Sequence, residues 1–208
     1  HDQSSAASDV YKRQLFFMEN QLKIIYLHGF NSSSESKKSK ILESFLEGNK
    51  FINLESPNLE TSPRKAICQI EKIIKESPDR VSLIGSSLGG LYATFLADAY
   101  SLKSVTINPV VKKHISGMKS LVGIHKKFHT EEEYEFSTED YSDLNKLGID
   151  NLKEPLNHLS LIKMSDEVLD HKMTFEYFSK SYILSEKGGN HSYDDFFEKI
   201  PLILNHMY

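Results

Sequence analysis

The chain has 208 residues, a formal net charge of −4 at pH 7 and a single cysteine, Cys68. A net acidic chain lacks the basic face that nucleic acid phosphates require, and it has no run of about 18 apolar residues that could span a membrane. One cysteine excludes an internal disulfide and is typical of the reducing cytoplasm. These features predict a cytoplasmic protein without a nucleic acid partner, and they leave the oligomeric state open.

Residues 1–17 differ in character from the rest of the chain. Ser4–Gln14 resembles the translation of a sequencing adaptor and matches no folding element. A secretory signal is not predicted, because no apolar run of about 7–15 residues precedes a small-residue cleavage site. We expect a non-native or disordered tail at 1–17, a native start at Met18 and a single domain over 18–208.

Short strand patterns alternate with helical stretches along this domain. The six predicted strands are Lys23–Leu27, Phe51–Leu54, Arg80–Ile84, Ser104–Asn108, Leu159–Met164 and Ser181–Leu184. A helix is predicted over 63–76, with Ser62 at its cap position and Pro63 in its first turn. Cys68 lies among the apolar residues of that helix, so we expect a buried or half-buried structural thiol. The alternation predicts an α/β protein with a mainly parallel sheet and helices on both faces.

The third predicted strand leads directly into Gly85-Ser86-Ser87-Leu88-Gly89, and a helix-forming apolar run follows. A G-x-S-x-G sequence at a strand-to-helix junction predicts a nucleophile elbow, a tight turn that exposes the central serine. Gly85 and Gly89 are small because the two backbones approach closely there. Ser87 is therefore the candidate nucleophile, and a purely structural serine is the alternative.

The loop after the first predicted strand is the candidate oxyanion loop. In an elbow fold, the oxyanion hole combines the N–H of the residue after the nucleophile with an N–H from the loop after an early strand. Here these are the backbone N–H groups of Leu88 and Phe30, which would stabilise charge that develops only in the tetrahedral state. We expect His28 to brace this loop and not to act as a second base, because one base suffices.

Residues 110–157 are rich in charged and aromatic side chains and have weak periodicity. They precede Asp166, a candidate catalytic acid, at the place where elbow folds insert a cap, so we expect a short, mobile lid. His114, His125 and His129 fall in this segment, but they lack the spacing, the cysteines or the paired carboxylates of a metal site. We interpret them as surface histidines and expect no bound metal.

The candidate acid and base follow the serine in the order that an elbow fold requires. Asp166 is the first acid after the fifth predicted strand, and His191 lies in a glycine-rich loop after the sixth. Both side chains would project from the carboxyl ends of parallel strands, where open α/β sheets place their sites. Glu167 and Asp170 remain alternatives to Asp166, with a solvated carboxylate and a helix N-cap as their other roles. For His191 the alternative is a surface loop histidine.

Five segments together resemble a known family. They are His28–Ser33, Gly85–Gly90, Asn108-Pro109, Asp166–Asp170 and Gly188–His191. In combination they are similar to the YqiA-type small bacterial esterases, over about residues 22–208. The resemblance implies a minimal single-domain α/β-hydrolase fold with a minimal cap, and it assigns Ser87 as nucleophile, Asp166 as acid and His191 as base. Ser165 departs from the glycine that the family often has before the acid.

The predicted function is hydrolysis of carboxylic esters of short to medium acyl chain length, through an acyl-enzyme on Ser87 and without a cofactor. An acyl-CoA thioesterase with the same triad is one alternative. A non-catalytic protein of the same fold that binds a small ligand or a partner is another, since a fold alone does not guarantee activity.

Overall fold

The computed structural model of the chain describes residues 21–127 and 132–208. The predicted tail at 1–17, the start at Met18 and His129 lie outside these residues. Within them, six strands form one sheet in which every neighbouring pair of strands is parallel. In sheet order they are β2 (Ile52–Glu55), β1 (Leu22–Leu27), β3 (Arg80–Ser86), β4 (Lys103–Ile107), β7 (His158–Lys163) and β8 (Tyr182–Glu186).

These six strands coincide with the predicted strands to within one or two residues at each end. The agreement follows from burial on both faces of the sheet, which turns a strand into a nearly continuous apolar run. In β1, for example, Leu22, Ile24 and Tyr26 belong to one hydrophobic core. Ile25 and Leu27 belong to the core on the other face.

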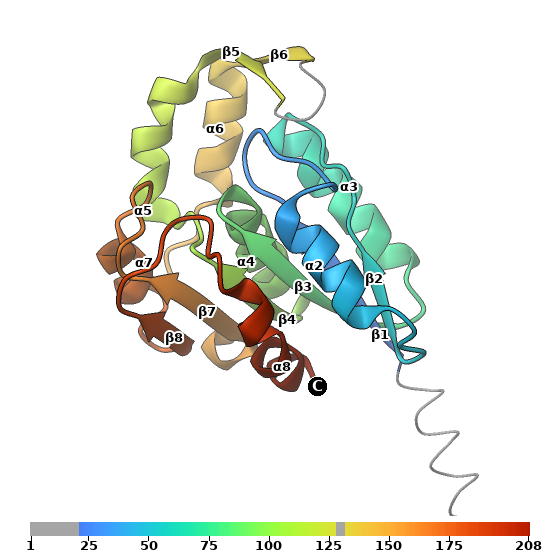
Figure 1. Cartoon of the computed structure of the whole chain (residues 1–208). Coiled ribbons are helices and arrows are strands. Elements are labelled where there is room, and N and C mark those ends of the chain that lie inside the picture. The colour runs from blue at the N-terminus through green and yellow to red at the C-terminus, as the bar shows by residue number, and fades with distance from the viewer. Residues whose placement is uncertain (1–20, 128–131) are drawn as a thin grey trace, which may run out of the picture.

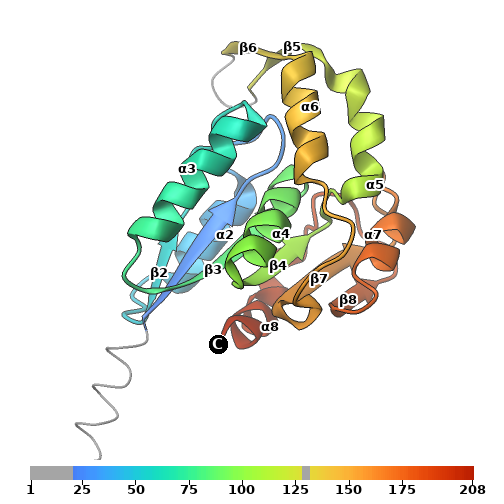
Figure 2. The same ribbon diagram turned by 180° about the vertical axis from the view of Figure 1, so that it is seen from behind.

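Helices cover both faces of the sheet (Figures 1 and 2). One face carries α2 (Lys37–Leu46) and α8 (Phe196–Met207), and the other carries α3 (Pro63–Glu76) and α4 (Leu88–Tyr100), with α6 (Thr138–Leu147) packed on the latter pair. A further helix, α7 (His171–Tyr177), packs against β7. The predicted fold class is confirmed. None of the helices that the structure describes is long and apolar enough to span a membrane.

Helix α3 begins at Pro63 and ends at Glu76, as predicted, although the side chain of Ser62 makes no capping hydrogen bond. The expectation for Cys68 was wrong, because its side chain is exposed. The buried side of α3 includes Ala66, Ile67 and Ile70. Consecutive residues of an α-helix are rotated by about 100°, so the residue after Ile67 turns away from that side. Apolar neighbours in sequence were therefore a poor guide to burial here.

The segment 110–157 contains more regular structure than its weak periodicity indicated. It forms α5 (Lys112–Ile115), the 3₁₀ helix η1 (Ser116–Leu121), strands β5 (Gly123–Lys126) and β6 (Glu133–Phe136), helix α6, and the 3₁₀ helix η2 (Pro155–Asn157). The two strands pair as an antiparallel hairpin, which lies at one end of the molecule beside α6 (Figures 1 and 2). Most of these elements are too short to show a helical or strand period in the sequence.

The turn between β3 and α4 consists of Ser87 alone, since β3 ends at Ser86 and α4 begins at Leu88. Ser87 has a φ of 55° and a ψ of −119°, a region that residues other than glycine rarely occupy. Its N–H donates to the carbonyl of Ile107 at 3.0 Å, and its carbonyl accepts from the N–H of Val110 at 3.0 Å. Both of its backbone polar groups are thus bonded, which holds the strained turn in place.

Two glycines make this turn possible by letting backbones touch. A Cβ atom on Gly85 would lie 2.1 Å from the carbonyl oxygen of Gly89. A Cβ atom on Gly89 would lie 2.1 Å from the carbonyl oxygen of Leu27 in β1. The neighbouring atoms are backbone, so they cannot move aside without displacing a strand or a helix.

We predict that Gly89→Ala lowers the free energy of unfolding by about 3 kcal/mol or more, as overpacking against rigid backbone does. Chemical denaturation followed by circular dichroism measures the change. Gly117→Ala is the matched control, because a Cβ atom there has no neighbour within 4 Å. A Gly89→Ala protein that is as stable as the Gly117→Ala protein would contradict the close packing of the turn.

Candidate active site

Ser87, His191 and Asp166 lie in series at the carboxyl edge of the sheet. Nε2 of His191 is 3.0 Å from Oγ of Ser87, and Nδ1 of His191 is 2.8 Å from Oδ2 of Asp166. The serine follows β3, the aspartate follows β7 and the histidine follows β8. Parallel strands end at one common edge, so three residues that are distant in the sequence meet there. The structure thus brings together the three residues that the sequence indicated.

Asp166 is held as an ionised hydrogen-bond acceptor. Its side chain is 3% exposed, and its Oδ1 accepts from the backbone N–H groups of Val168 and Leu169 at 2.8 and 2.9 Å. Burial alone would raise the pKa of Asp166, but the hydrogen bonds from His191 and the two amides outweigh it and lower the pKa. Its second oxygen, Oδ2, remains directed at the imidazole ring.

The two alternative acids make other contacts. Oδ1 of Asp170 accepts from the N–H of Lys172 at 2.9 Å and caps α7, which was its alternative role. Oε2 of Glu167 accepts from the backbone N–H of His191 at 2.9 Å. Glu167 therefore helps to hold the histidine loop, a role that its sequence position did not reveal. Of the three acids, Asp166 is the one that contacts the ring.

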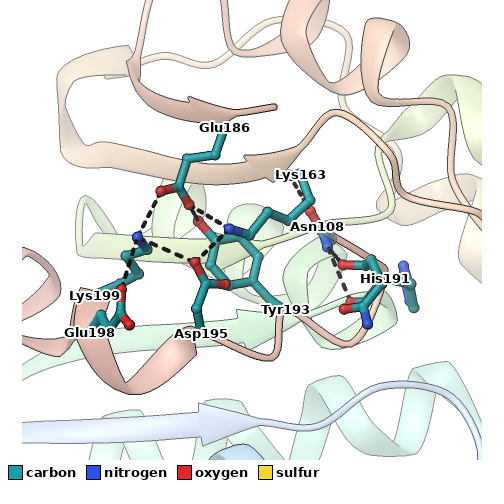
Figure 3. A network of polar contacts seen from close by, with 9 residues as sticks. Asn108, Lys163, Glu186, His191, Tyr193, Asp195, Glu198 and Lys199 are labelled. Atoms are coloured by element: carbon teal, nitrogen blue, oxygen red, sulfur yellow. Dashed lines mark hydrogen bonds and ion pairs between the residues drawn. The ribbon is translucent and has the colours of Figure 1, made fainter. Parts of the chain in front are cut away.

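Asn108 holds the His191 loop from the end of β4, and Figure 3 shows this contact. Its Nδ2 donates to the carbonyls of Asn190 and His191 at 3.0 and 3.1 Å. Its Oδ1 accepts from the N–H of Lys163 at 2.8 Å. One amide side chain thus joins three chain segments. The sequence showed Asn108 within a family motif but gave it no role, because the contact requires that the end of β4 lies beside the loop after β8.

A network of charges anchors the chain just after His191 (Figure 3). Nζ of the buried Lys163 lies 2.7 Å from Glu186 and 2.6 Å from Asp195. The hydroxyl of Tyr193, which is fully buried, donates to Glu186 at 2.8 Å, and the Lys163 ammonium lies 4.4 Å from the Tyr193 ring centroid. Burial alone would raise the pKa of Glu186, but hydrogen bonds from Lys163, Lys199 and Tyr193 lower it to about 2. The ion pairs of the buried Lys163 with two partly exposed carboxylates thus join the chain after His191 to the ends of β7 and β8.

The candidate oxyanion loop passes close to the serine. The N–H groups of Phe30 and Leu88 donate no hydrogen bond to any residue that the structure describes. A Cβ atom on Gly29 would lie 3.2 Å from Cβ of Ser87, so the loop packs directly on the turn. His28 braces the loop, because its Nε2 accepts from the N–H of Leu59 at 3.0 Å and its Nδ1 lies 2.9 Å from the carbonyl of Gly29.

The β5–β6 hairpin packs on this loop. The Phe30 ring makes edge contacts with His125 and Phe136, at centroid distances of 5.0 and 5.6 Å. The hydroxyl of Tyr134 donates to Oδ1 of Asn31. The segment 110–157 therefore touches the loop that carries a candidate oxyanion donor. Its movement as a lid stays a prediction.

The expectation of surface histidines in that segment was wrong for His114. This side chain is buried, and its ring contacts the N–H of Val111 and the carbonyl of Asp170, both at 3.1 Å. Burial lowers the pKa of His114, which favours the neutral ring. His125 is half-buried against Phe30. Among the residues that the structure describes, no group of three or more His, Cys, Asp or Glu side chains could hold a metal ion.

Two cavities of different character meet at Ser87, and Phe30 and His191 line both. The first, which we call the apolar cavity, has a volume of about 670 Å³. Its apolar lining includes Leu88, Val110, Met118, Leu121, Leu169 and Met173. The second, the polar cavity, has a volume of about 330 Å³. Its polar lining includes Ser32, Ser36, Lys37, Lys38, Ser192 and Asp194.

Comparison with known proteins agrees with this architecture. The model of the family described as "Uncharacterised protein family (UPF0227)" matches residues 23–207. A UPF0227 protein of Serratia proteamaculans (strain 568) is 27% identical over 166 residues, which cover 76% of this chain and 83% of that protein. The family match confirms the resemblance that the sequence motifs indicated.

Two solved structures are similar in fold. Alpha/beta hydrolase domain-containing protein 10 from mouse has a TM-score of 0.71 at 13% identity, over 89% of this chain and 90% of that chain. Est1E from Butyrivibrio proteoclasticus, with ferulic acid bound, has a TM-score of 0.67 at 14% identity, over 91% of this chain and 88% of that chain. These likenesses confirm the α/β-hydrolase fold.

Proposed function

We propose that this chain, which belongs to the UPF0227 family, is a serine hydrolase that cleaves carboxylic esters of short to medium acyl chain length. The observation that carries the proposal is the continuous series of hydrogen-bond contacts from Asp166 through His191 to Ser87. A structural serine has no need of a base that a buried carboxylate orients. The mouse protein of similar fold is named as an alpha/beta hydrolase domain-containing protein, which supports the reaction class by analogy of fold.

The proposed reaction has two halves. In the first, Nε2 of His191 takes the proton of Ser87 as Oγ attacks the carbonyl carbon, and His191 then gives this proton to the departing alcohol. In the second, His191 takes a proton from water, the resulting hydroxide attacks the acyl-enzyme, and Ser87 recovers its proton as the acid leaves. Asp166 stabilises the imidazolium that forms in each half.

The oxyanion of each tetrahedral intermediate would accept hydrogen bonds from the N–H groups of Phe30 and Leu88. Both groups are without an acceptor among the described residues, and both belong to segments that touch Ser87. Donors that are already in place cost no reorganisation when charge develops, and loss of one such donor costs a factor of about 10²–10³ in kcat.

The apolar cavity supports an acyl substrate. Its volume of about 670 Å³ lies in the range of small-molecule sites, and its lining beside Ser87 is largely hydrophobic. A thioester would use the same catalytic groups, so the acyl-CoA thioesterase remains the alternative within this mechanism. Parallel assays of p-nitrophenyl esters and acyl-CoAs of graded chain length distinguish the two. A cytoplasmic location also stays a prediction.

The first test is covalent labelling. We expect a fluorophosphonate to form one adduct, on Ser87, and to abolish hydrolysis of p-nitrophenyl butyrate. Ser87→Ala should lose the label and lower kcat by at least about 10⁴-fold, since the remaining residues cannot replace a nucleophile. Ser86→Ala, one residue away, should keep the label and most of the activity. A folded wild-type protein that forms no adduct on Ser87 would refute the proposed mechanism.

The acid is tested by two matched amide substitutions. Asp166→Asn keeps an acceptor for the amides of Val168 and Leu169 but loses the charge beside the ring, so kcat should fall by about 10⁴-fold. Asp170→Asn should leave kcat near the wild-type value and cost at most about 1 kcal/mol in stability, because an asparagine also caps helices well. Steady-state kinetics with one common substrate compares them. The opposite ranking would mean that Asp170 is the acid.

Asn108 is expected to position the base. Asn108→Asp keeps the acceptor for the N–H of Lys163 but replaces the two donated hydrogen bonds by repulsion between oxygens. A displaced histidine should lower kcat by about 10²-fold with a smaller change in KM. Asn145→Asp, at an exposed position of α6, is the control. Equal kcat values for the two variants, with normal thermal unfolding, would exclude this role for Asn108.

A further inference from the structure

The polar cavity opens onto Ser87 but is lined by other elements than the apolar cavity. Its residues come from the end of β1, the loop that leads into α2, the first turn of α2 and the chain after His191. The apolar cavity is lined instead by α5, η1 and the start of α7 with the loop before it. An ester that reacts at Ser87 has two halves, which extend from the carbonyl carbon in different directions. Two cavities that share the nucleophile can each receive one half.

The polar cavity carries one lysine, Lys38, that has no direct ion pair. Its charged lining consists of Lys37, Lys38 and Asp194, beside the ring of His191. Nζ of Lys37 pairs with Oδ1 of Asp194 at 3.2 Å, and Oδ2 of that carboxylate accepts from Asn190 at 2.7 Å. The side-chain ammonium of Lys38 makes no ion pair or hydrogen bond with any residue that the structure describes, and the charge of Asp194 acts on it only from a longer distance. One positive charge in the lining is therefore left over.

Lys38 is also partly withdrawn from water. Its side chain is half-buried, and burial lowers its pKa to about 8, although the charge of Asp194 acts in the opposite direction. Lys40, on the same helix, is exposed and forms ion pairs with Glu35 at 3.0 Å and with Glu43 at 3.1 Å. An ammonium group that has lost part of its hydration without gaining a counter-ion is a favourable place for an anion.

We propose that Lys38 binds an anionic group, a carboxylate or a phosphate, on the alcohol half of the ester. The inference rests on the proposed function and names the class of substrate that this site takes. Ser32 lines the same cavity, and a serine hydroxyl can donate a further hydrogen bond to such a group.

The character of the two cavities assigns the halves. A hydrocarbon acyl chain gains free energy in the apolar cavity, whereas in the polar cavity it would displace water from charged groups. The alcohol must leave after the first half of the reaction, before water attacks. The polar cavity has an open rim for that purpose, because the side chains of Lys37 and Asp194 are 72% and 60% exposed.

The test compares esters that share a hexanoyl group. One carries para-hydroxybenzoate as its alcohol half, one carries the neutral methyl ester of that acid, and one carries para-hydroxyphenyl phosphate. For the wild type, kcat/KM should be higher for an anionic ester than for the neutral one, and the comparison of carboxylate with phosphate shows which anion is preferred. Lys38→Met should lower that preference by about tenfold, mainly through KM.

Two control variants separate charge from structure. Lys38→Arg should retain most of the preference, and Lys40→Met should leave it unchanged, because Lys40 does not line the cavity. Added salt should weaken the preference of the wild type. A substrate with its carboxylate on the acyl half, the monoester of adipic acid with a neutral phenol, should be insensitive to Lys38→Met.

The outcomes distinguish this inference from the proposed function. Hydrolysis of all the esters with the same preference in the wild type and in Lys38→Met would overturn the role of Lys38 and leave the serine mechanism intact. A loss confined to the adipate monoester would overturn the assignment of the alcohol half. Absence of turnover together with absence of labelling on Ser87 would overturn the serine mechanism, and this inference with it.

Discussion

The site depends on one steric constraint, the direct contact between backbone atoms at the turn between β3 and α4. Gly85 packs against the carbonyl of Gly89, and Gly89 packs against the carbonyl of Leu27. The backbones of β3, α4 and β1 are therefore in direct contact at one point. Ser87 joins these elements with a positive φ. The hydrogen bonds that it donates to Ile107 and accepts from Val110 hold its backbone in that conformation. Strain at a functional residue persists only where the surrounding structure over-determines it.

The same edge of the sheet must also present His191, the candidate base, at hydrogen-bond distance from Ser87, and a glycine-rich loop does not hold such a position alone. Asn108 ties the loop to β4 and β7 on one side of His191. On its other side, Tyr193 inserts into the core next to the ion pairs of Lys163. The loop thus combines flexible backbone with anchors on both sides, which fits a ring that must keep contact with two partners.

The sequence was sufficient for the parts of the molecule that are governed by burial or by chain order. The strands of the sheet are apolar runs, and the order of Ser87, Asp166 and His191 together with their positions after strands places them at one edge. Neither inference requires knowledge of which strands are neighbours. The elbow glycines were indicated by their motif, although only the steric demand on Gly85 lies within its five residues, since Gly89 packs against Leu27 of β1.

What the sequence did not reveal depends on contacts between distant segments. The role of Asn108 requires that β4 ends beside the loop after β8, and the burial of His114 requires that α5 packs beside Asp170. The β5–β6 hairpin has four residues in each strand, which is too short for a period to be recognised. The exposed Cys68 shows the converse error, since its neighbours in sequence suggested burial but helix geometry turns it outward.

Phe30 connects these separate features. Its backbone N–H is a candidate oxyanion donor, its side chain packs on the hairpin, and the residue lines both cavities. The contacts of its ring with His125 and Phe136 join this residue to the β5–β6 hairpin. The proposed substrate halves would therefore meet at a residue that packs against the segment 110–157. In this way a part of the chain that supplies no candidate catalytic group contacts the residue that the candidate oxyanion hole and both cavities share.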